Sequence, residues 1–248
     1  MKRNLKLVLE YDGARFHGWQ YQVGQRTVQG VFEETLARLT GENIRVIAAS
    51  RTDAGVHALG QVLNFRTESR HPGEVFVRAL NALLPGDVAV LACEEAEEKF
   101  NARFWSRGKI YRYLIYNRAH RRGFGHNYCW HFPWSLELEA MKQASEYLMG
   151  SHNFRSFQGQ SPDRLKKDPV RELRRIDIIA TDSGYIIFEL EANSFLKQMA
   201  RNIIGTLVLA GRGKIRPETV QEILASKDRR QAGPTAPPDG LYLVKVLY

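Results

Sequence analysis

The sequence has little cysteine and no long apolar run. Only two cysteines occur in 248 residues, Cys93 and Cys129, and neither has a second cysteine or a histidine at ligand spacing. A disulfide framework and a zinc site are therefore not indicated. No apolar run approaches the roughly 20 residues that a membrane-crossing helix requires. We therefore expect a cytoplasmic protein.

Several familiar catalytic motifs are also missing. The sequence contains no P-loop, no GxGxxG fingerprint, no HExxH and no GxSxG. Nucleotide hydrolysis, dinucleotide redox chemistry, zinc proteolysis and α/β-hydrolase chemistry therefore have no motif support. His57, His71 and His152 show no metal-ligand spacing, so we interpret them as structural histidines and expect no metal.

Acidic residues are absent from one long central stretch. The formal net charge is +9, and no Asp or Glu occurs between Asn101 and Leu136. The cations of this stretch are Arg103, Arg107, Lys109, Arg112, Arg118, Arg121 and Arg122. They alternate with ten aromatic residues, a combination that suits single-stranded or loop RNA. The alternative is that most rings belong to the core and the arginines to a solvated face.

A second basic run covers residues 163–175, DRLKKDPVRELRR. Its charges alternate with apolar residues, as they do in an ordinary exposed strand with its loop. The same pattern suits contact with RNA phosphates. The sequence alone leaves both interpretations open.

The order of periodic segments predicts an α+β fold made of two similar halves. Residues 1–105 contain strand, helix, two strands, helix and strand, and residues 106–248 repeat this order. Thr27 is placed to cap the first helix, Gly41 to end it, and Ser135 to cap the first helix of the second half. This βαββαβ order is ferredoxin-like, and it predicts mainly antiparallel sheets with helices on one face.

Residues 50–57, SRTDAGVH, place a carboxylate between two predicted strands. Thr-Asp-Ala-Gly is a good turn sequence, because Asp caps its own backbone and Gly accepts positive φ. A carboxylate flanked by Arg51 also stays ionised when partly desolvated, and such a group serves as a nucleophile. The pattern alone favours the turn.

Seven motifs resemble the tRNA pseudouridine synthase A family. They are YDGARFHGWQ (11–20), QRTVQG (25–30), SRTDAGVHALGQV (50–62), FNARF (100–104), KIYRYLIYN (109–117), NSFLKQMARNIIG (193–205) and GLYL (240–243). They run through the whole chain in the family's order. The resemblance implies two ferredoxin-like halves joined into one continuous, mainly antiparallel sheet, with a basic central cleft.

Three positions depart from the family's usual residues. Ser50 stands where the family usually has Gly, Asn101 where it has His, and Lys109 where it has Arg. Lys109 keeps the charge but loses the bidentate fork of arginine. Ser50 lies at the approach to the Asp53 loop, and none of the three touches the RTDAGVH core.

The resemblance implies an activity without cofactor or metal. The family converts uridine to pseudouridine at tRNA positions 38–40, in the anticodon arm, and acts as a homodimer. Asp53 matches the family's catalytic aspartate. It attacks either the anomeric carbon of the ribose or the uracil ring, and the sequence does not choose between them.

Three further residues match family positions around the target uridine. Tyr111 matches the tyrosine that stacks on the flipped base, Arg201 the arginine that pairs with the carboxylate, and Arg51 a contact to the target phosphate. The ordinary alternatives are a core tyrosine for Tyr111 and a snorkelling cation for Arg201.

Two rival functions stay open at this point. An RNA-binding module without catalysis explains the charge equally well, but it does not explain a carboxylate within the RNA surface. An enzyme of the same kind acting on other structured RNA is the second rival, because the sequence says little about the cleft that selects the substrate.

Overall fold

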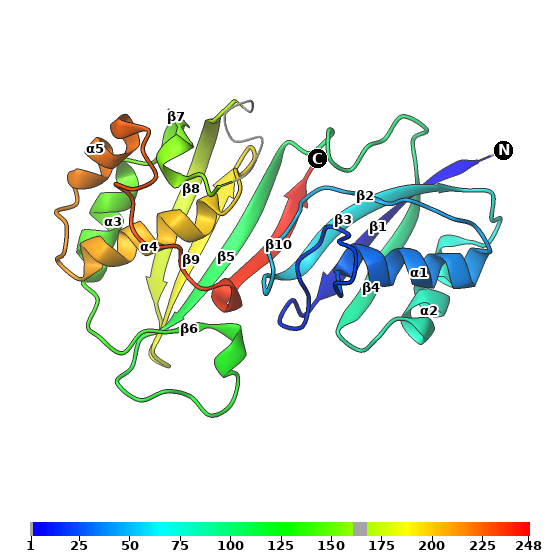
Figure 1. Cartoon of the computed structure of the whole chain (residues 1–248), viewed down its shortest axis with the longest axis horizontal. Helices are drawn as coiled ribbons and strands as arrows, with labels where there is room; N and C mark the ends of the chain where they lie inside the picture. Colours follow the sequence, from blue (N-terminus) through cyan, green and yellow to red (C-terminus); the bar gives the residue numbers. More distant parts are fainter. Residues whose placement is uncertain (1, 161–167) are drawn as a thin grey trace. The chain divides into compact units, whose positions relative to one another are not determined.

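The computed structural model describes residues 2–160 and 168–248. It separates into two compact units, Met1–Arg107 with Tyr242–Tyr248, and Gly108–Leu241 (Figure 1). Element order alone assigns the last strand to the C-terminal half, whereas the structure groups it with the N-terminal unit. The hydrophobic pattern of a terminal strand shows that it is a strand. It does not show which sheet edge the strand pairs with.

The N-terminal unit contains the predicted βαββαβ order. From Leu5 to Tyr11, strand β1 alternates buried residues with less buried ones, as a half-buried strand does. The sheet runs β4-β1-β3-β10, with β2 added to β3, and only the short β3–β10 pairing is parallel. Its elements are β1 (Arg3–Tyr11), α1 (Val28–Thr40), β2 (Ile47–Ala48), β3 (His57–Thr67), α2 (Gly73–Leu83), β4 (Val88–Ala96) and β10 (Leu241–Leu247).

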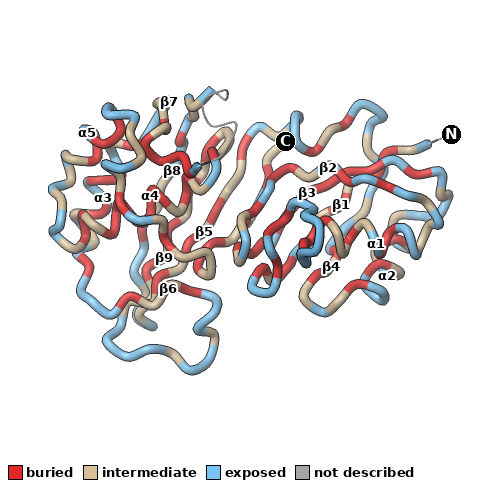
Figure 2. Tube along the Cα trace, in the orientation of Figure 1, coloured by how far each residue is buried: buried red, intermediate tan, exposed pale blue. Residues whose placement is uncertain are grey.

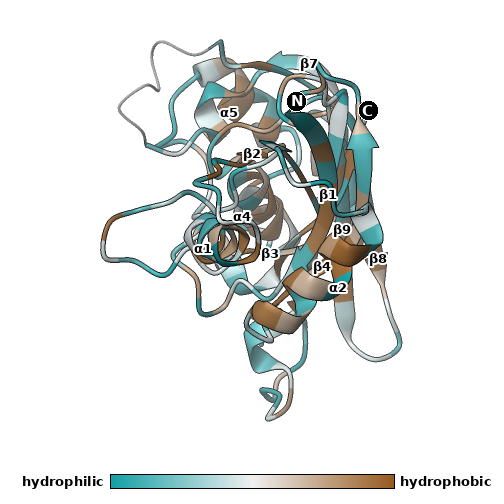
Figure 3. Ribbon diagram, turned by 90° about the vertical axis from the view of Figure 1, so that its right-hand side faces the viewer, coloured by the Kyte–Doolittle hydropathy of each residue, from teal (hydrophilic) through white to brown (hydrophobic). Residues whose placement is uncertain are grey.

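Helices α1 and α2 cover one face of this sheet (Figure 1). Much of α2 is hydrophobic (Figure 3), and its Phe76 ring lies 6.0 Å from the ring of Phe65 in β3. Leu5 and Leu7 of β1 are fully buried on the same side. Burial of such side chains contributes about 1.5–3 kcal/mol each, so this layer fixes the strands that flank residues 50–57.

The C-terminal unit follows the same order with two short strands added, β6 before its first helix and β7 after it. Its sheet runs β5-β9-β8-β7 with antiparallel neighbours, and β6 pairs in parallel with β5. Its regular elements are β5 (Gly108–Tyr116), β6 (Trp130–His131), α3 (Leu138–Glu146), β7 (Gly150–Asn153), β8 (Val170–Ala180), β9 (Tyr185–Ala192), α4 (Met199–Gly211) and α5 (Thr219–Ser226). Short 3-10 turns cover His126–Tyr128, Phe154–Phe157 and Pro238–Gly240.

Helix α4 is the central helix of the C-terminal unit and is buried along most of its length (Figure 2). The sequence predicts a helix from Phe195, but α4 begins at Met199 after Gln198, whose φ is 58°. A non-glycine residue in this left-handed region is uncommon and prevents the helix from extending backwards. In the part of the chain that the structure describes, no helix is long and apolar enough to span a membrane.

Two of the three predicted helix boundaries are confirmed. The Thr27 hydroxyl accepts a hydrogen bond from the Gly30 amide, and Gly41 ends α1 with a φ of 73°. The predicted Ser135 cap is wrong, because α3 begins at Leu138 after Glu137 and has no side-chain cap. The Glu137 amide instead donates to the carbonyl of Gly211, so packing on α4 sets this boundary.

Candidate active site

Asp53 opens a tight turn between β2 and β3. The Asp53 carbonyl accepts a hydrogen bond from the Val56 amide at 3.2 Å, and Gly55 occupies the third turn position with a φ of 78°. A type II turn requires positive φ at that position, which glycine supplies without strain. Asp53 is half-buried, and Ala54 beside it is exposed. The turn that the sequence predicts is therefore present.

The YDGARFHGWQ segment holds this turn through backbone and side-chain hydrogen bonds. The Trp19 amide donates to the Thr52 carbonyl at 3.1 Å, and the Gly55 amide donates to the Phe16 carbonyl at 3.2 Å. The Tyr11 hydroxyl and the Thr52 hydroxyl are 2.8 Å apart and hydrogen-bonded. Residues on both sides of Asp53 are thus fixed by one neighbouring segment, which restricts the positions open to its carboxylate.

Gly13 and Gly18 allow the two backbones to approach closely. A Cβ atom on Gly13 would lie 2.0 Å from the carbonyl oxygen of Val56, and one on Gly18 would lie 2.7 Å from that of Thr52. Both neighbours are backbone atoms that cannot rotate away. The glycines of this motif are therefore required by the Asp53 turn that they contact.

We expect Gly13→Ala to lower the free energy of unfolding by about 3 kcal/mol, because the added methyl group forces the two backbones apart. Gly86→Ala is the matched control, since nothing lies within 4 Å of a Cβ there, and we expect a change within about 0.5 kcal/mol. Urea unfolding of both variants measures the difference. Equal stability of the two would show that Gly13 does not support the turn.

Gln61 holds the start of the same loop, a role that its place in a predicted strand does not indicate. Its side chain is fully buried, accepts from the Ser50 amide at 3.2 Å and donates to the Ser50 carbonyl at 2.8 Å. An amide that satisfies both backbone groups of one residue fixes that residue closely. A polar residue within the predicted strand GQVLNFRT was the available signal.

Positive charge lies beside the turn. Arg51 is exposed, and its pKa is lowered by partial burial and by the neighbouring Arg103 cation. The Arg103 guanidinium lies 5.7 Å from the ring of Phe104, whose side chain is 78% exposed. The two guanidinium groups repel each other, and an anion placed near both would stabilise them. This corner of the N-terminal unit therefore suits a phosphate next to a flat base.

Tyr111 lies on β5 of the C-terminal unit and is only 7% exposed. It pairs with Leu190 of β9, and its ring meets the ring of Phe195 edge-on at 4.9 Å. Tyr113, two residues on, is fully buried on the same strand face, as the two-residue period predicts. The edge contact with Phe195 restricts the plane of the Tyr111 ring.

Arg201 lies in the first turn of α4 and is anchored to residues 233–237. Its Nε donates to the Ala236 carbonyl at 2.7 Å, and the Ala236 amide donates to the Arg201 carbonyl at 3.1 Å. The Tyr113 hydroxyl donates to the Pro237 carbonyl at 2.8 Å. Burial raises the pKa of Tyr113 well above its ordinary value, the Arg201 cation opposes this, and Asp239 and Cys129 add to it.

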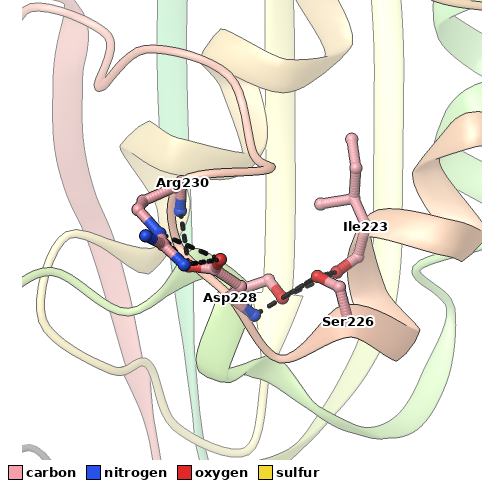
Figure 4. Close-up of polar contacts among 5 residues, drawn as sticks. Ile223, Ser226, Asp228 and Arg230 are labelled. Carbon is pink, nitrogen blue, oxygen red and sulfur yellow. Dashed lines mark hydrogen bonds and ion pairs between the residues drawn. The ribbon is translucent and has the colours of Figure 1, made fainter.

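Residues 228–237 form a segment that follows α5 and runs along α4. The turn that starts it is closed by an ion pair between Asp228 and Arg230, and the Ser226 hydroxyl donates to the Ile223 carbonyl (Figure 4). The Thr235 hydroxyl then donates to the Asn202 side chain at 2.6 Å.

Gly205 gives this segment its close approach to the helix. A Cβ atom there would lie 1.7 Å from the Pro234 carbonyl oxygen. The Gly233 amide also donates to the Thr206 hydroxyl at 2.9 Å. The segment and α4 thus form one rigid support for Arg201.

The four predicted site residues lie in two units. Asp53 and Arg51 belong to the N-terminal unit, and Tyr111 and Arg201 to the C-terminal unit. Among residues 2–160 and 168–248, no group of three or more His, Cys, Asp or Glu side chains is arranged to hold a metal ion.

The second basic run is only partly described, because residues 163–167 lie outside the described residues. Residues 170–175 are in β8, where Arg174 pairs with Glu172 at 2.9 Å. Arg175 pairs with Glu189 at 2.7 Å and with Asp177 at 3.3 Å. These carboxylates pair with Arg174 and Arg175, so the ordinary exposed strand is the better interpretation of these two positions.

Comparison with known proteins identifies the family. The model of the tRNA pseudouridine synthase family matches residues 7–104 and 144–248, on either side of an unmatched stretch. Relatives described as tRNA pseudouridine synthase A are 45% identical in Thermoanaerobacter sp. (strain X514) and 43% identical in Caldicellulosiruptor bescii, each over 99% of this chain and 100% of the relative. The relative in Myxococcus xanthus is 45% identical over 98% of this chain and 91% of its own length.

The chain belongs to the tRNA pseudouridine synthase A family. It is therefore an isomerase that converts uridine to pseudouridine in tRNA. The matched segments contain Asp53 and Arg201, whereas Tyr111 lies in the unmatched stretch 105–143 and its assignment depends on the KIYRYLIYN motif. Family membership also removes the rival interpretation of an RNA-binding module without catalysis.

Proposed function

We propose that this tRNA pseudouridine synthase modifies positions 38–40 of the anticodon arm, with Asp53 as its nucleophile. The observation that carries the proposal is the Asp53 turn. It is half-buried, held by the 11–20 segment and by Gln61, and lies beside the Arg51 cation. A rigid carboxylate next to a phosphate-binding cation is the arrangement that attack on a nucleotide requires.

The reaction balances without a second substrate. The bond between ribose C1′ and uracil N1 breaks, and a bond between C1′ and uracil C5 forms. The proton on C5 leaves, and N1 of the turned uracil takes up a proton. Asp53 forms a transient ester with C1′ or adds to the uracil ring, and its carboxylate is released again in the final step in both cases. The balance requires no cofactor.

Each other site residue has one task in this proposal. The target uridine leaves its stack, and the fixed ring of Tyr111 stacks on it while the phenol handles the proton removed from C5. Arg201, oriented by Ala236, is the counter-ion of the Asp53 carboxylate. Arg51 binds the phosphate of the target nucleotide. The family's basic cleft, its homodimer and a cytoplasmic location belong to the same proposal.

Four transcripts of one tRNA test which uridines the enzyme modifies. Three keep a single uridine at position 38, 39 or 40, and the fourth has none there. After incubation with the protein, carbodiimide treatment and primer extension map pseudouridine. We expect a new stop at the one uridine of each of the first three transcripts and none in the fourth. Stops only outside the anticodon arm would show that the enzyme acts on another RNA site.

A further inference from the structure

The C-terminal unit contains a basic pocket whose lining includes none of the residues assigned above. Its volume is about 480 Å³, which is within the range of small-ligand sites. It lies in the stretch between the two segments that the family model matches. Its lining residues are Tyr116, Arg121, Arg122, Gly123, His126, Cys129 and His131, and none of them is acidic.

Arg122 is held in place by aromatic side chains and not by a carboxylate. Its guanidinium lies 5.4 Å from the ring centres of both Tyr116 and Tyr185, and it donates to the Tyr185 hydroxyl. Arg121 beside it is exposed. Among the residues that the structure describes, no carboxylate forms an ion pair with either arginine. Their charge is therefore available to an anion that enters the pocket.

Two histidines add fixed rings to the lining. His131 Nε2 lies 2.9 Å from the Arg118 carbonyl, and His126 Nδ1 lies 3.2 Å from the Gly123 carbonyl. A carbonyl only accepts hydrogen bonds, so each of these nitrogens is the donor. The orientation of both rings is thereby set, and neither ring introduces a negative charge.

The carboxylate of Asp239 acts electrostatically on the lining residue Cys129, but it does not cancel the positive charge of the pocket. Burial raises the pKa of the Cys129 thiol, the Arg122 cation opposes this, and Asp239 adds to it. The thiol therefore stays neutral at physiological pH. Two arginines against one carboxylate leave the lining positive.

Two exposed aromatic residues that are sequence neighbours of the lining residues favour a nucleic acid over a small free anion. Phe124 is 88% exposed and Tyr128 is 44% exposed, and both belong to the same loop as the two arginines. Exposed rings next to guanidinium groups bind unstacked bases beside phosphates. A small anion uses the arginines alone and does not contact these exposed rings.

We propose that this pocket is a second tRNA contact, which binds a backbone phosphate between Arg121 and Arg122 with an unpaired base on the exposed rings. The inference depends on tRNA as the substrate and not on the chemistry assigned to Asp53. Phosphate contacts of this kind set the register of an RNA on its enzyme.

Phosphate-ethylation interference tests the proposal. A tRNA ethylated at random phosphates is partitioned into bound and free fractions with the wild-type protein and with an Arg121→Gln, Arg122→Gln double variant. We expect about a tenfold weaker affinity of the double variant and a salt dependence reduced by about one unit of slope. At least one phosphate that interferes with wild-type binding should no longer interfere.

An Arg70→Gln, Arg78→Gln double variant is the control, since it removes the same charge from exposed positions of the N-terminal unit. It should keep the whole interference pattern. Arg121→Gln alone, at an exposed position, should lose the same phosphate with a smaller change in affinity. A weaker affinity with every interfering phosphate retained would overturn the proposal, because that result reflects general charge.

A final comparison separates this site from a free-anion site and from the active site. Inorganic phosphate could stabilise the wild-type protein but not the double variant, while the tRNA interference pattern stays the same in both. That result would also overturn the proposal of a second tRNA contact. If the interference result is as expected but no pseudouridine forms at positions 38–40, then the proposed function fails and the second tRNA contact stands.

Discussion

Asp53→Asn is expected to lower the single-turnover rate of pseudouridine formation by at least about a thousandfold, because an amide cannot serve as the nucleophile. The affinity for tRNA should stay within about threefold, since asparagine keeps the shape of the turn and removes a negative charge from an RNA surface. Primer-stop mapping gives the rate, and a gel-shift titration gives the affinity.

Asp177→Asn is the matched control for this substitution. Asp177 lies on the exposed strand β8, 3.3 Å from Arg175, and has no place in the proposed chemistry. Its variant should retain the wild-type rate. An Asp53→Asn variant that reacts within tenfold of the wild-type rate at saturating tRNA would contradict the role of Asp53 as nucleophile.

Arg201→Met is expected to reduce kcat by about 100-fold to 1000-fold, the range observed when one group that stabilises charge in the reaction is removed. Arg201→Lys should recover part of the loss. Lysine keeps the charge but lacks the planar fork, and with it the bond from Nε to the Ala236 carbonyl. Single-turnover kinetics at saturating tRNA report this effect apart from binding.

Arg212→Met provides the same change at the other end of α4. Arg212 lies over the Trp134 ring at 5.0 Å and has no task in the proposed site. Thermal unfolding of both variants shows whether α4 remains packed. If Arg201→Met and Arg212→Met lose activity to the same extent, or only through unfolding, then Arg201 has a structural role alone.

The local elements of the fold were predictable because their signals lie within a few residues. Strand β1 alternates, and α1 carries a capping threonine at one end and Gly41 at the other. The apolar run IRVIAAS predicts a strand over 44–50, but β2 covers only Ile47–Ala48, because pairing with Asn64 and Leu63 of β3 sets its length. Pairing partners are distant in the chain, so a window of the sequence does not reveal them.

The part of the candidate site that lies within a sequence motif was predictable. RTDAGVH indicates Asp53 and its turn, and the turn is present. The hydrogen bonds of the supporting groups were not predictable: Gln61 lies in the same motif as Ser50, but the motif does not show their bond, and Pro237 accepts from Tyr113, which is 124 residues away. The left-handed Gln198 likewise has no local signal, since glycine is the residue that usually marks such a conformation.

The most direct test of the central claim is tritium release from tRNA labelled at C5 of uridine, measured with stoichiometric protein. The wild-type chain should release one tritium for each pseudouridine mapped at positions 38–40, and Asp53→Asn should release none while it still binds the tRNA. Tritium release that continues in Asp53→Asn at the wild-type rate would contradict the account.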